Sequence, residues 1–343
     1  MSRRVFADVD EFADAITGVA GRFLPTGSSA SSWWIDRVEL GSAALQHVQI
    51  GSSATFAGAA MRDTLTLGLP LTNPGEIRID GRSLSAHSFV VLADAQPFTF
   101  TGREVTRWAG ITVPLGDAPF DGEWLALARR SEGPRAHAHR AQLELLCSLV
   151  TRACSGDAGV SFGDRAAVRD AEQDVMLAAA RVLERSSRIA QPRIGRPYLP
   201  RERLIARTLQ LVEAHRDEPL LLGELCSELA VSERTLRNVF QEYFGVGPMR
   251  FLKLRQLREI NAALSQADPS QETVTHLAGQ FGVWDFSLFA RNYKRLYGES
   301  PSATLRKPPA ASAVHEGPSW FSYAAKVFAD YAPLPDVVRN AAA

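Results

Sequence analysis

The stretch that decides the fold of the C-terminal third is LAGQFGVWDFSLFARNYKRLYGESP, Leu277–Pro301, because it repeats an earlier one. The earlier copy is LCSELAVSERTLRNVFQEYFGVGP, Leu225–Pro248. Corresponding residues are 52 positions apart before the turn and 53 after it, so the second copy has one extra residue in its turn. The matched pairs are Leu225 and Leu277, Leu229 and Phe281, Val231 and Val283, then Leu236 and Phe289, Phe240 and Tyr293, Gly245 and Gly298, and Pro248 and Pro301.

Each copy predicts a short helix, a tight turn and a second helix whose apolar residues, four positions apart, share one face. Residues that begin and end helices stand at the expected places: Ser232 and Asp285 as N-caps, and Gly245 and Gly298 as left-handed residues after the last turn. This is the pattern of helix-turn-helix, whose second helix enters the major groove of DNA. Residues 248–266 predict one connecting helix, about 28 Å long at ~1.5 Å per residue. That length is close to the ~34 Å between successive major-groove segments on one face of B-DNA.

The composition indicates a two-domain protein without a strongly basic surface. The chain has 343 residues, 45% of them hydrophobic, and its 38 Lys and Arg balance 38 Asp and Glu. Residues 196–307 hold 16 Lys and Arg against 13 Asp and Glu, a mild excess that does not by itself demonstrate nucleic-acid binding. The sequence contains no apolar run of membrane-spanning length, no signal-peptide core and no metal-ligand spacing among its three cysteines. We therefore predict a cytoplasmic protein with reduced thiols and no membrane association.

The N-terminal half predicts a β domain followed by helices. Residues 30 to about 115 contain short alternating strands separated by turn signals, which is typical of a sandwich or small barrel. The predicted strands are Ile35–Leu40, Leu45–Ile50, Leu65–Leu71, Ile77–Ile79, Phe89–Leu92 and Val105–Val113. Residues 136–186 change to helical spacing and predict a helical hairpin with two apolar stripes. Residues 187–200 predict an extended linker, and residues 318–331 carry an aromatic cluster to which the sequence assigns no function.

The paired units and their connecting helix resemble the AraC/XylS-type transcription regulators over about residues 200–307. The most specific block is Gly282-Val283, then Phe289-Ala290-Arg291-Asn292-Tyr293-Lys294, then Gly298-Glu299-Ser300-Pro301. Val283 departs from the family, which usually has phenylalanine there, and the adjacent Trp284 is expected to fill that space. The Gly-Val-Trp block and Pro301–Leu305 look most similar to the ethanolamine-operon regulators.

The resemblance implies an α+β multidomain architecture. A cupin-like β barrel with a helical hairpin is expected over residues 1–186 and a linker over 187–200. An all-α, double helix-turn-helix DNA-binding domain is expected over 201–307 and a tail over 308–343.

The resemblance also implies which residues contact DNA. By position, Arg234, Arg237 and Asn238 match the base-contacting sites of the family. Arginine suits guanine and asparagine suits adenine, each pairing being worth ~1–3 kcal/mol of discrimination. The predicted DNA-binding residues are Arg234, Arg237, Asn238, Gln241, Phe286, Ser287, Arg291, Lys294 and Arg295, with Lys294, Arg295 and Arg306 expected at phosphates. Phe286 is interpreted either as a contact to thymine methyl groups or as a core residue.

The N-terminal half gives no sign of catalysis, of a metal or of a cofactor. Its only histidines before residue 125 are His47 and His87, forty positions apart. The one His-x-His, at 137 and 139, is placed at the start of the helical hairpin, where residues two apart point to different sides. Trp33, Trp34 and Trp108 are candidates for an apolar small-molecule pocket, although ordinary core is the commoner role of such residues.

Three functions stay open at this point. The favoured one is a transcription regulator, an activator by family resemblance, that binds double-stranded operator DNA and responds to an unknown small-molecule effector. Its further expected partners are RNA polymerase and a second copy of the chain, bound through the hairpin. The alternatives are a ligand-independent DNA-binding protein and, less favoured, a cupin-type enzyme fused to a DNA-binding domain. A hairpin that merely covers the barrel would bury the same apolar stripes as a dimer interface would.

Overall fold

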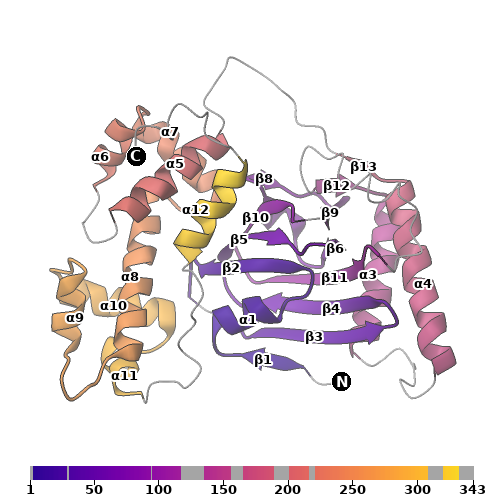
Figure 1. The fold of residues 1–343 in the computed structure, drawn as a ribbon, viewed down its shortest axis with the longest axis horizontal. Helices are drawn as coiled ribbons and strands as arrows, with labels where there is room; N and C mark the ends of the chain where they lie inside the picture. The colour runs from indigo at the N-terminus through magenta and orange to yellow at the C-terminus, as the bar shows by residue number, and fades with distance from the viewer. Residues whose placement is uncertain are drawn as a thin grey trace. The chain divides into compact units, whose positions relative to one another are not determined.

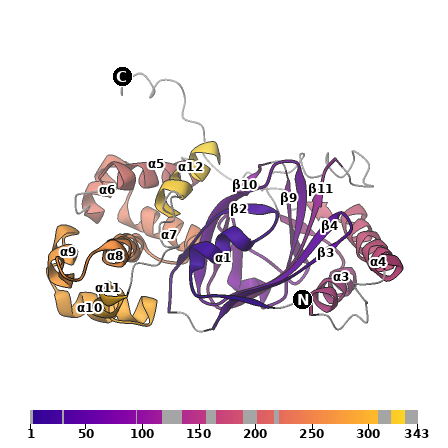
Figure 2. The same ribbon diagram turned by 60° about the horizontal axis from the view of Figure 1, so that its bottom comes forward.

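The computed structural model, shown in Figures 1 and 2, describes residues 3–28, 31–93, 95–116, 135–155, 165–188, 201–215, 221–307 and 320–331. The chain divides into two compact units, one of residues 1–23 and 30–195 and the other of residues 24–29 and 196–343. Within the described ranges, no helix has the length and apolar character that a membrane crossing requires. The predicted linker lies mostly outside these ranges, and its first two residues, Ser187–Arg188, form a short strand.

The strands of the first unit form two sheets. The larger has the order β1 (Arg4–Phe6), β3 (Trp33–Leu40), β4 (Ala43–Ile50), β11 (Thr106–Pro114), β6 (Thr64–Pro70), β9 (Ser88–Ala93), β12 (Arg135–His137), β13 (Ser187–Arg188). The smaller has the order β2 (Val19–Pro25), β5 (Ala54–Ala60), β10 (Pro97–Gly102), β7 (Ile77–Ile79), β8 (Arg82–Ser83). No strand among the described residues belongs to both sheets, so the predicted barrel is not closed and the sandwich alternative describes the fold better.

Aromatic side chains from both sheets fill the space between them. The ring centroid of Phe23 on β2 lies 5.5 Å from that of Trp33 on β3 and 4.8 Å from that of Phe56 on β5. Phe100 on β10 meets Trp108 on β11 at 5.7 Å. Helix α1 (Val9–Ala15) adds a fully buried phenylalanine to the same cluster. This interior is therefore a packed aromatic core shared by the two layers.

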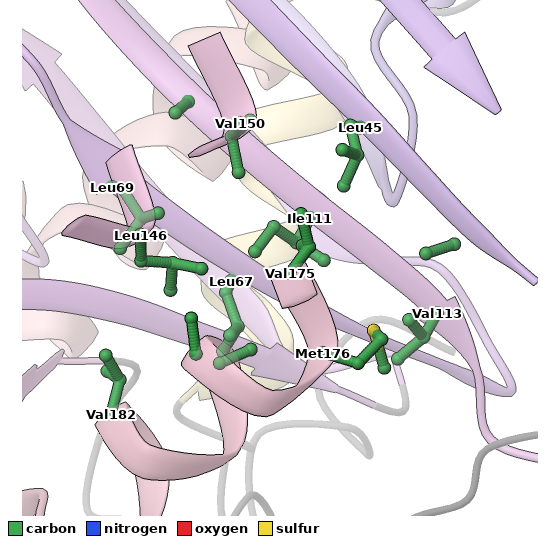
Figure 3. Packing of buried hydrophobic residues seen from close by; sticks show 14 of the residues in the cluster. Leu45, Leu67, Leu69, Ile111, Val113, Leu146, Val150, Val175, Met176 and Val182 are labelled. Atoms are coloured by element: carbon green, nitrogen blue, oxygen red, sulfur yellow. The ribbon is translucent and has the colours of Figure 1, made fainter. Parts of the chain in front are cut away.

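The helical hairpin covers the outer face of the larger sheet. It consists of α3 (Arg140–Ser155) and α4 (Arg165–Glu184). Figure 3 shows Leu146 and Val150 of α3 and Val175 of α4 against Leu67 and Ile111 of the sheet, all within one buried cluster. The two predicted stripes thus cover the sheet. Leu145 on α3 and Leu177 on α4 point outward instead, each 52% exposed.

The segment before the hairpin differs from the prediction. His137 was expected on a helix but belongs to strand β12, which pairs with β9 and β13, and α3 begins only at Arg140. Sheet pairing to Phe89 and Ser88 competes successfully with the helical pattern that continues from residue 140.

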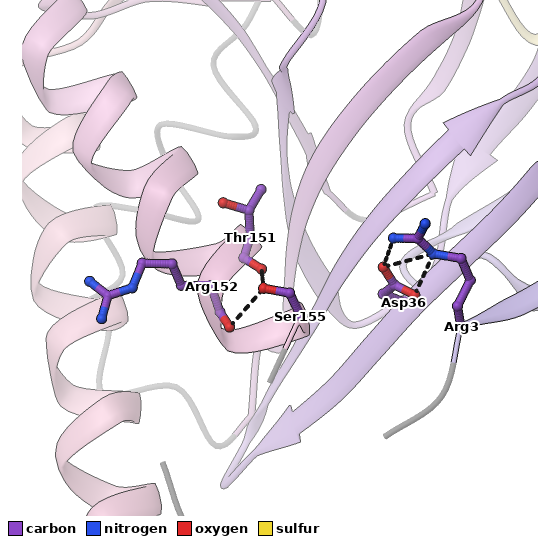
Figure 4. A network of polar contacts seen from close by, with 5 residues as sticks. All are labelled: Arg3, Asp36, Thr151, Arg152 and Ser155. Atoms are coloured by element: carbon purple, nitrogen blue, oxygen red, sulfur yellow. Dashed lines mark hydrogen bonds and ion pairs between the residues drawn. The ribbon is translucent and has the colours of Figure 1, made fainter. Parts of the chain in front are cut away.

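Polar contacts hold the N-terminal segment against the larger sheet and close the last turn of α3. The Asp36 carboxylate on β3 is buried and accepts from the Arg3 guanidinium, with an Nη2–Oδ2 distance of 2.7 Å (Figure 4). The same guanidinium lies 3.7 Å from the Trp34 ring centroid. At the end of α3, the Ser155 hydroxyl donates to the Thr151 carbonyl at 2.8 Å, which closes the last helical turn. Arg3 thus ties the first strand to the sheet edge by charge and by ring contact.

Replacing Glu172 with alanine is expected to lower the free energy of unfolding by ~1–2 kcal/mol. The Glu172 carboxylate on α4 accepts from the Ser42 backbone N–H at 2.9 Å and from its hydroxyl at 3.1 Å, in the turn between β3 and β4. Urea denaturation of the full chain measures the loss. Asp170→Ala, an exposed acidic residue on the same helix, is the control. Equal stability of the two variants would show that this anchor contributes nothing.

The second unit contains two helix-turn-helix pairs joined by one helix. The helices are α5 (Arg201–Ala214), α6 (Leu222–Glu228), α7 (Glu233–Tyr243), α8 (Pro248–Gln266), α9 (Val274–Gln280), α10 (Phe286–Tyr297), α11 (Pro301–Arg306) and α12 (Trp320–Tyr331). The pairs are α6–α7 and α9–α10, and α8 has the bounds that its apolar spacing predicts. Its start fits Pro248, since proline is well tolerated in the first helical turn.

Each pair has its own core, and α8 contributes to both. Leu257, Ile260 and Leu264 of α8 pack in one buried cluster with Phe289 and Tyr293 of α10. Earlier on α8, Phe251 stacks on Phe244, which follows α7, with ring centroids 4.8 Å apart. A single unbroken helix thereby links the two recognition helices.

Helix α12 completes the core of the first pair. The Trp320 ring is fully buried, with centroids 5.7 Å from Phe244 and 5.5 Å from Phe251. Phe328, also fully buried, meets Tyr243 at 5.8 Å, and α12 packs along α5. The aromatic cluster near residue 320 is therefore a structural element of the first pair.

Candidate nucleic-acid interface

Helix α7 presents one polar face to solvent. Its N-cap Ser232 accepts from the Thr235 N–H at 3.2 Å, as the sequence predicts, and its apolar side is buried. Arg234, Arg237, Asn238 and Gln241 are all exposed. Their spacing of three, four and seven residues places them along one stripe. The structure thus brings the four predicted reading residues of the first pair together.

Two of these side chains have partners within the protein. Arg237 pairs with Glu233 one turn earlier on α7, and both side chains are more than half exposed. The Gln241 amide donates to the Gly245 carbonyl at 2.9 Å. An exposed pair of this kind is worth little, so the Arg237 guanidinium can exchange Glu233 for a DNA acceptor at small cost.

Helix α10 is built in the same way. The Asp285 side chain caps it by accepting from the Leu288 N–H at 2.9 Å, and Gly298 ends it with a φ of 75°, which only glycine adopts readily. Ser287, Arg291, Lys294 and Arg295 are exposed, and the Arg295 guanidinium donates to Asn292 at 2.8 Å. Phe286, for which a core position was the alternative, is 38% exposed.

Tyr293 holds α10 in place from behind. Its hydroxyl lies 2.5 Å from Asn261 Oδ1 on α8 and 2.9 Å from Thr304 Oγ1 on α11. Burial raises the pKa of Tyr293 to about 12, so the hydroxyl stays protonated throughout the physiological range. These bonds fix the orientation of the helix whose opposite face is exposed.

The prediction for Trp284 is wrong. Its side chain is 90% exposed and does not fill the space of the family's phenylalanine. Val283 occupies the core position itself, because it is buried and its N–H donates to the Ala278 carbonyl at 3.1 Å. The repeat contained the signal: Val231 matches Val283 at the offset of 52, so Trp284 is the extra residue and has no core counterpart.

The three tryptophans predicted for an effector pocket do not share one site. Trp33 lies in the aromatic core between the sheets, whereas Trp34 faces the other side of β3, where it contacts Arg3 and His47. Trp108 borders the core beside Phe100. Among the described residues no group of histidine, cysteine or acidic side chains is arranged to hold a metal ion.

Comparison with known proteins finds a family match within the second unit. Residues 225–307 match a family described as a helix-turn-helix domain. The chain is 34% identical over 123 residues to a probable thc operon regulatory protein of Rhodococcus erythropolis, covering 36% of each protein. It is 31% identical over 101 residues to the XylDLEGF operon transcriptional activator of Pseudomonas putida, covering 29% of this chain and 32% of the activator.

One solved structure is similar to part of the chain. A probable AraC family transcriptional regulator from Rhodopseudomonas palustris is 32% identical, with a TM-score of 0.28, and the match covers 30% of this chain and 94% of that one. The chain spans about a third of the length of the two operon regulators that it matches. The ethanolamine-operon subgroup stays a prediction.

Proposed function

The chain belongs, through its helix-turn-helix region, to the AraC/XylS-type family of transcription regulators, and on that premise we propose that it is a sequence-specific regulator of an operon, acting as an activator. It binds double-stranded operator DNA with both recognition helices and, as an activator, contacts RNA polymerase in the cytoplasm. The proposed function does not include catalysis.

One observation carries this proposal: each copy of the repeat exposes the residues that a recognition helix uses while its apolar side is buried. On α7 these are arginine and asparagine side chains suited to guanine and adenine edges. On α10, Arg291, Lys294 and Arg295 supply positive charge for phosphates. The shared helix α8 sets the distance between the two helices, as expected for binding successive major-groove segments.

Replacing Arg237 with alanine is expected to weaken binding to operator DNA by roughly 5–150-fold, the range of one lost bidentate base contact. Binding to DNA of unrelated sequence should fall far less, because phosphate contacts carry it. Fluorescence anisotropy at fixed salt with both DNAs gives the two ratios. Arg207→Ala, an exposed arginine on α5 outside the recognition helices, is the matched control. An equal loss on both DNAs would show that Arg237 contacts only phosphate.

We infer further that the first unit binds the effector between its two sheets. Support comes from the chemistry of the interior, which is apolar and aromatic like the lining of most small-molecule sites. Because rings from both sheets fill that space, the effector would have to displace some of them. Coupling to DNA requires that the effector bind the two states of the protein with different affinity. A thermal-shift screen of small metabolites, followed by operator binding with each hit, tests this. Operator affinity that no hit changes would favour a ligand-independent regulator.

Dimerisation is the last part of the proposal. The apolar stripes of the hairpin are occupied by the sheet, so the outward-facing Leu145 and Leu177 are the apolar side chains that a partner copy would cover. Sedimentation of the full chain over a hundredfold range of concentration gives the oligomeric state. A strict monomer would contradict a dimer, and Leu145→Asp should shift a real dimer toward monomer.

A further inference from the structure

Trp284 is the largest exposed apolar side chain of the second pair, and its position is fixed by its neighbours. It is the residue by which the second turn is longer than the first. On one side, the buried Val283 is held by its bond to the Ala278 carbonyl; on the other, Asp285 caps α10. The ring, 90% exposed, therefore projects from a fixed backbone directly before the recognition helix.

Two further apolar side chains are exposed in the first turn of α10. Phe286 is 38% exposed and Leu288 is 44% exposed. Because residues two apart on a helix point to different sides, Phe286 and Leu288 lie on different sides of α10. Trp284, directly before the helix, is the most exposed apolar side chain at this end. In the first pair, the equivalent turn of α7 carries Glu233, Arg234 and Thr235. The two recognition helices therefore differ in chemistry at the end that reaches deepest into DNA.

The charge along α10 indicates what the Trp284 ring contacts. The helix carries Arg291, Lys294 and Arg295, all exposed, and no acidic residue. Positive charge at one end of a recognition helix complements phosphates and places the N-terminal end at base edges. The apolar feature of the major groove is the C5-methyl group of thymine. A DNA segment that presents thymines thus matches both the basic end and the apolar end of α10.

We propose that Trp284 reads thymine methyl groups in the groove segment bound by the second pair. This inference rests on the proposed DNA-binding function and assigns different base contacts to the two pairs. The first pair selects guanine and adenine edges by hydrogen bonds, whereas the second selects thymine-rich sequence by apolar contact. Trp284 is a specificity residue outside the helix proper.

The test uses the full chain and duplexes that it selects from a random pool. In each selected duplex, thymines are replaced one at a time by deoxyuridine, which lacks only the methyl group. We expect the unsubstituted protein to lose about fourfold in affinity at each contacted thymine, the contribution of one buried methyl group. W284A should bind the thymine duplex about tenfold more weakly and lose its sensitivity to deoxyuridine at those positions.

Two controls separate this effect from misfolding. W284A should keep the melting temperature of the unsubstituted protein, because the ring is almost wholly in solvent. Leu221→Ala, an apolar residue 60% exposed beside α6, should leave both the affinity and the deoxyuridine penalty unchanged.

Three outcomes would overturn the inference while leaving DNA binding intact. W284A could bind both duplexes as the unsubstituted protein does, which would remove Trp284 from the interface. It could bind both more weakly with the deoxyuridine penalty retained, which would place the ring against the sugar-phosphate backbone. It could bind DNA normally but fail to activate transcription, which would assign the ring to a protein partner. Enrichment of no sequence by the unsubstituted chain would instead refute the proposed function, and the inference with it.

Discussion

Replacing Trp320 with alanine is expected to cost ~3–5 kcal/mol of stability and to abolish operator binding. The indole is fully buried against Phe244, Phe251 and Phe321, with ring centroids between 5.1 and 5.7 Å away. A cavity of that size cannot be refilled by the neighbouring rings, which are themselves fixed by edge-to-face contacts. Since domains are typically stable by only ~5–15 kcal/mol, the first helix-turn-helix pair should be largely unfolded or loosened.

Urea denaturation and operator affinity, measured on the same preparation, test this expectation. Lys326 is an exposed residue on the same helix. Lys326→Ala should leave stability and operator affinity unchanged, and it controls for a general effect of substitutions in α12. A Trp320→Ala protein that unfolds at the same urea concentration as its parent would mean that α12 is not part of this core in solution.

Replacing Phe289 with alanine should have an effect of similar size on the other pair, ~3–5 kcal/mol. Phe289 is buried beside Tyr293, with ring centroids 5.6 Å apart, in the cluster that joins α8, α9 and α10. Its loss should release α10 and leave the first pair to bind DNA alone. We therefore expect weak operator binding. The affinity should also depend less steeply on salt concentration, because the phosphate contacts of α10 are lost.

Phe286→Ala is the matched control, since it removes the same side chain from the same helix at a more exposed position. It should lower operator affinity with little loss of stability, whereas Phe289→Ala lowers both. Denaturation followed by circular dichroism separates the two variants. If both lost the same stability, Phe286 would be a core residue and its place in the DNA contact surface would be wrong.

The DNA-binding half was largely predictable because its signals are local. Ser232 and Asp285 cap the helices that they were expected to cap, and Gly298 takes the left-handed conformation that ends α10. The bounds of α8 follow from Pro248 and the apolar spacing behind it. Trp284 was misassigned because tryptophan is usually buried. The register of the repeat instead places Val283 in the core and leaves Trp284 as the extra residue of the turn.

The N-terminal half was harder because its decisive contacts are non-local. Strand β5, ATFAGAA, is rich in alanine and glycine, and strand β2, VAGRFLP, shows little alternation, so neither was predicted. Pairing between distant segments determines such strands, as when β10 pairs with β5. The hairpin stripes showed that α3 and α4 bury a face, but a stripe carries no information on whether a sheet or a second subunit covers it.

The position of α12 has a consequence for how the protein is made. The first pair precedes the second in the chain, yet its core closes only when Trp320 has been synthesised. Phe251 precedes Trp320 by roughly 70 residues, which take several seconds to translate at ~5–20 residues per second. During that interval all residues of the second core, up to Leu305, have already been added. The later pair can therefore fold first, while the nascent earlier pair keeps Phe244 and Phe251 uncovered. A growing chain in this state exposes an aromatic surface to chaperones and cannot bind DNA with both pairs until α12 has emerged.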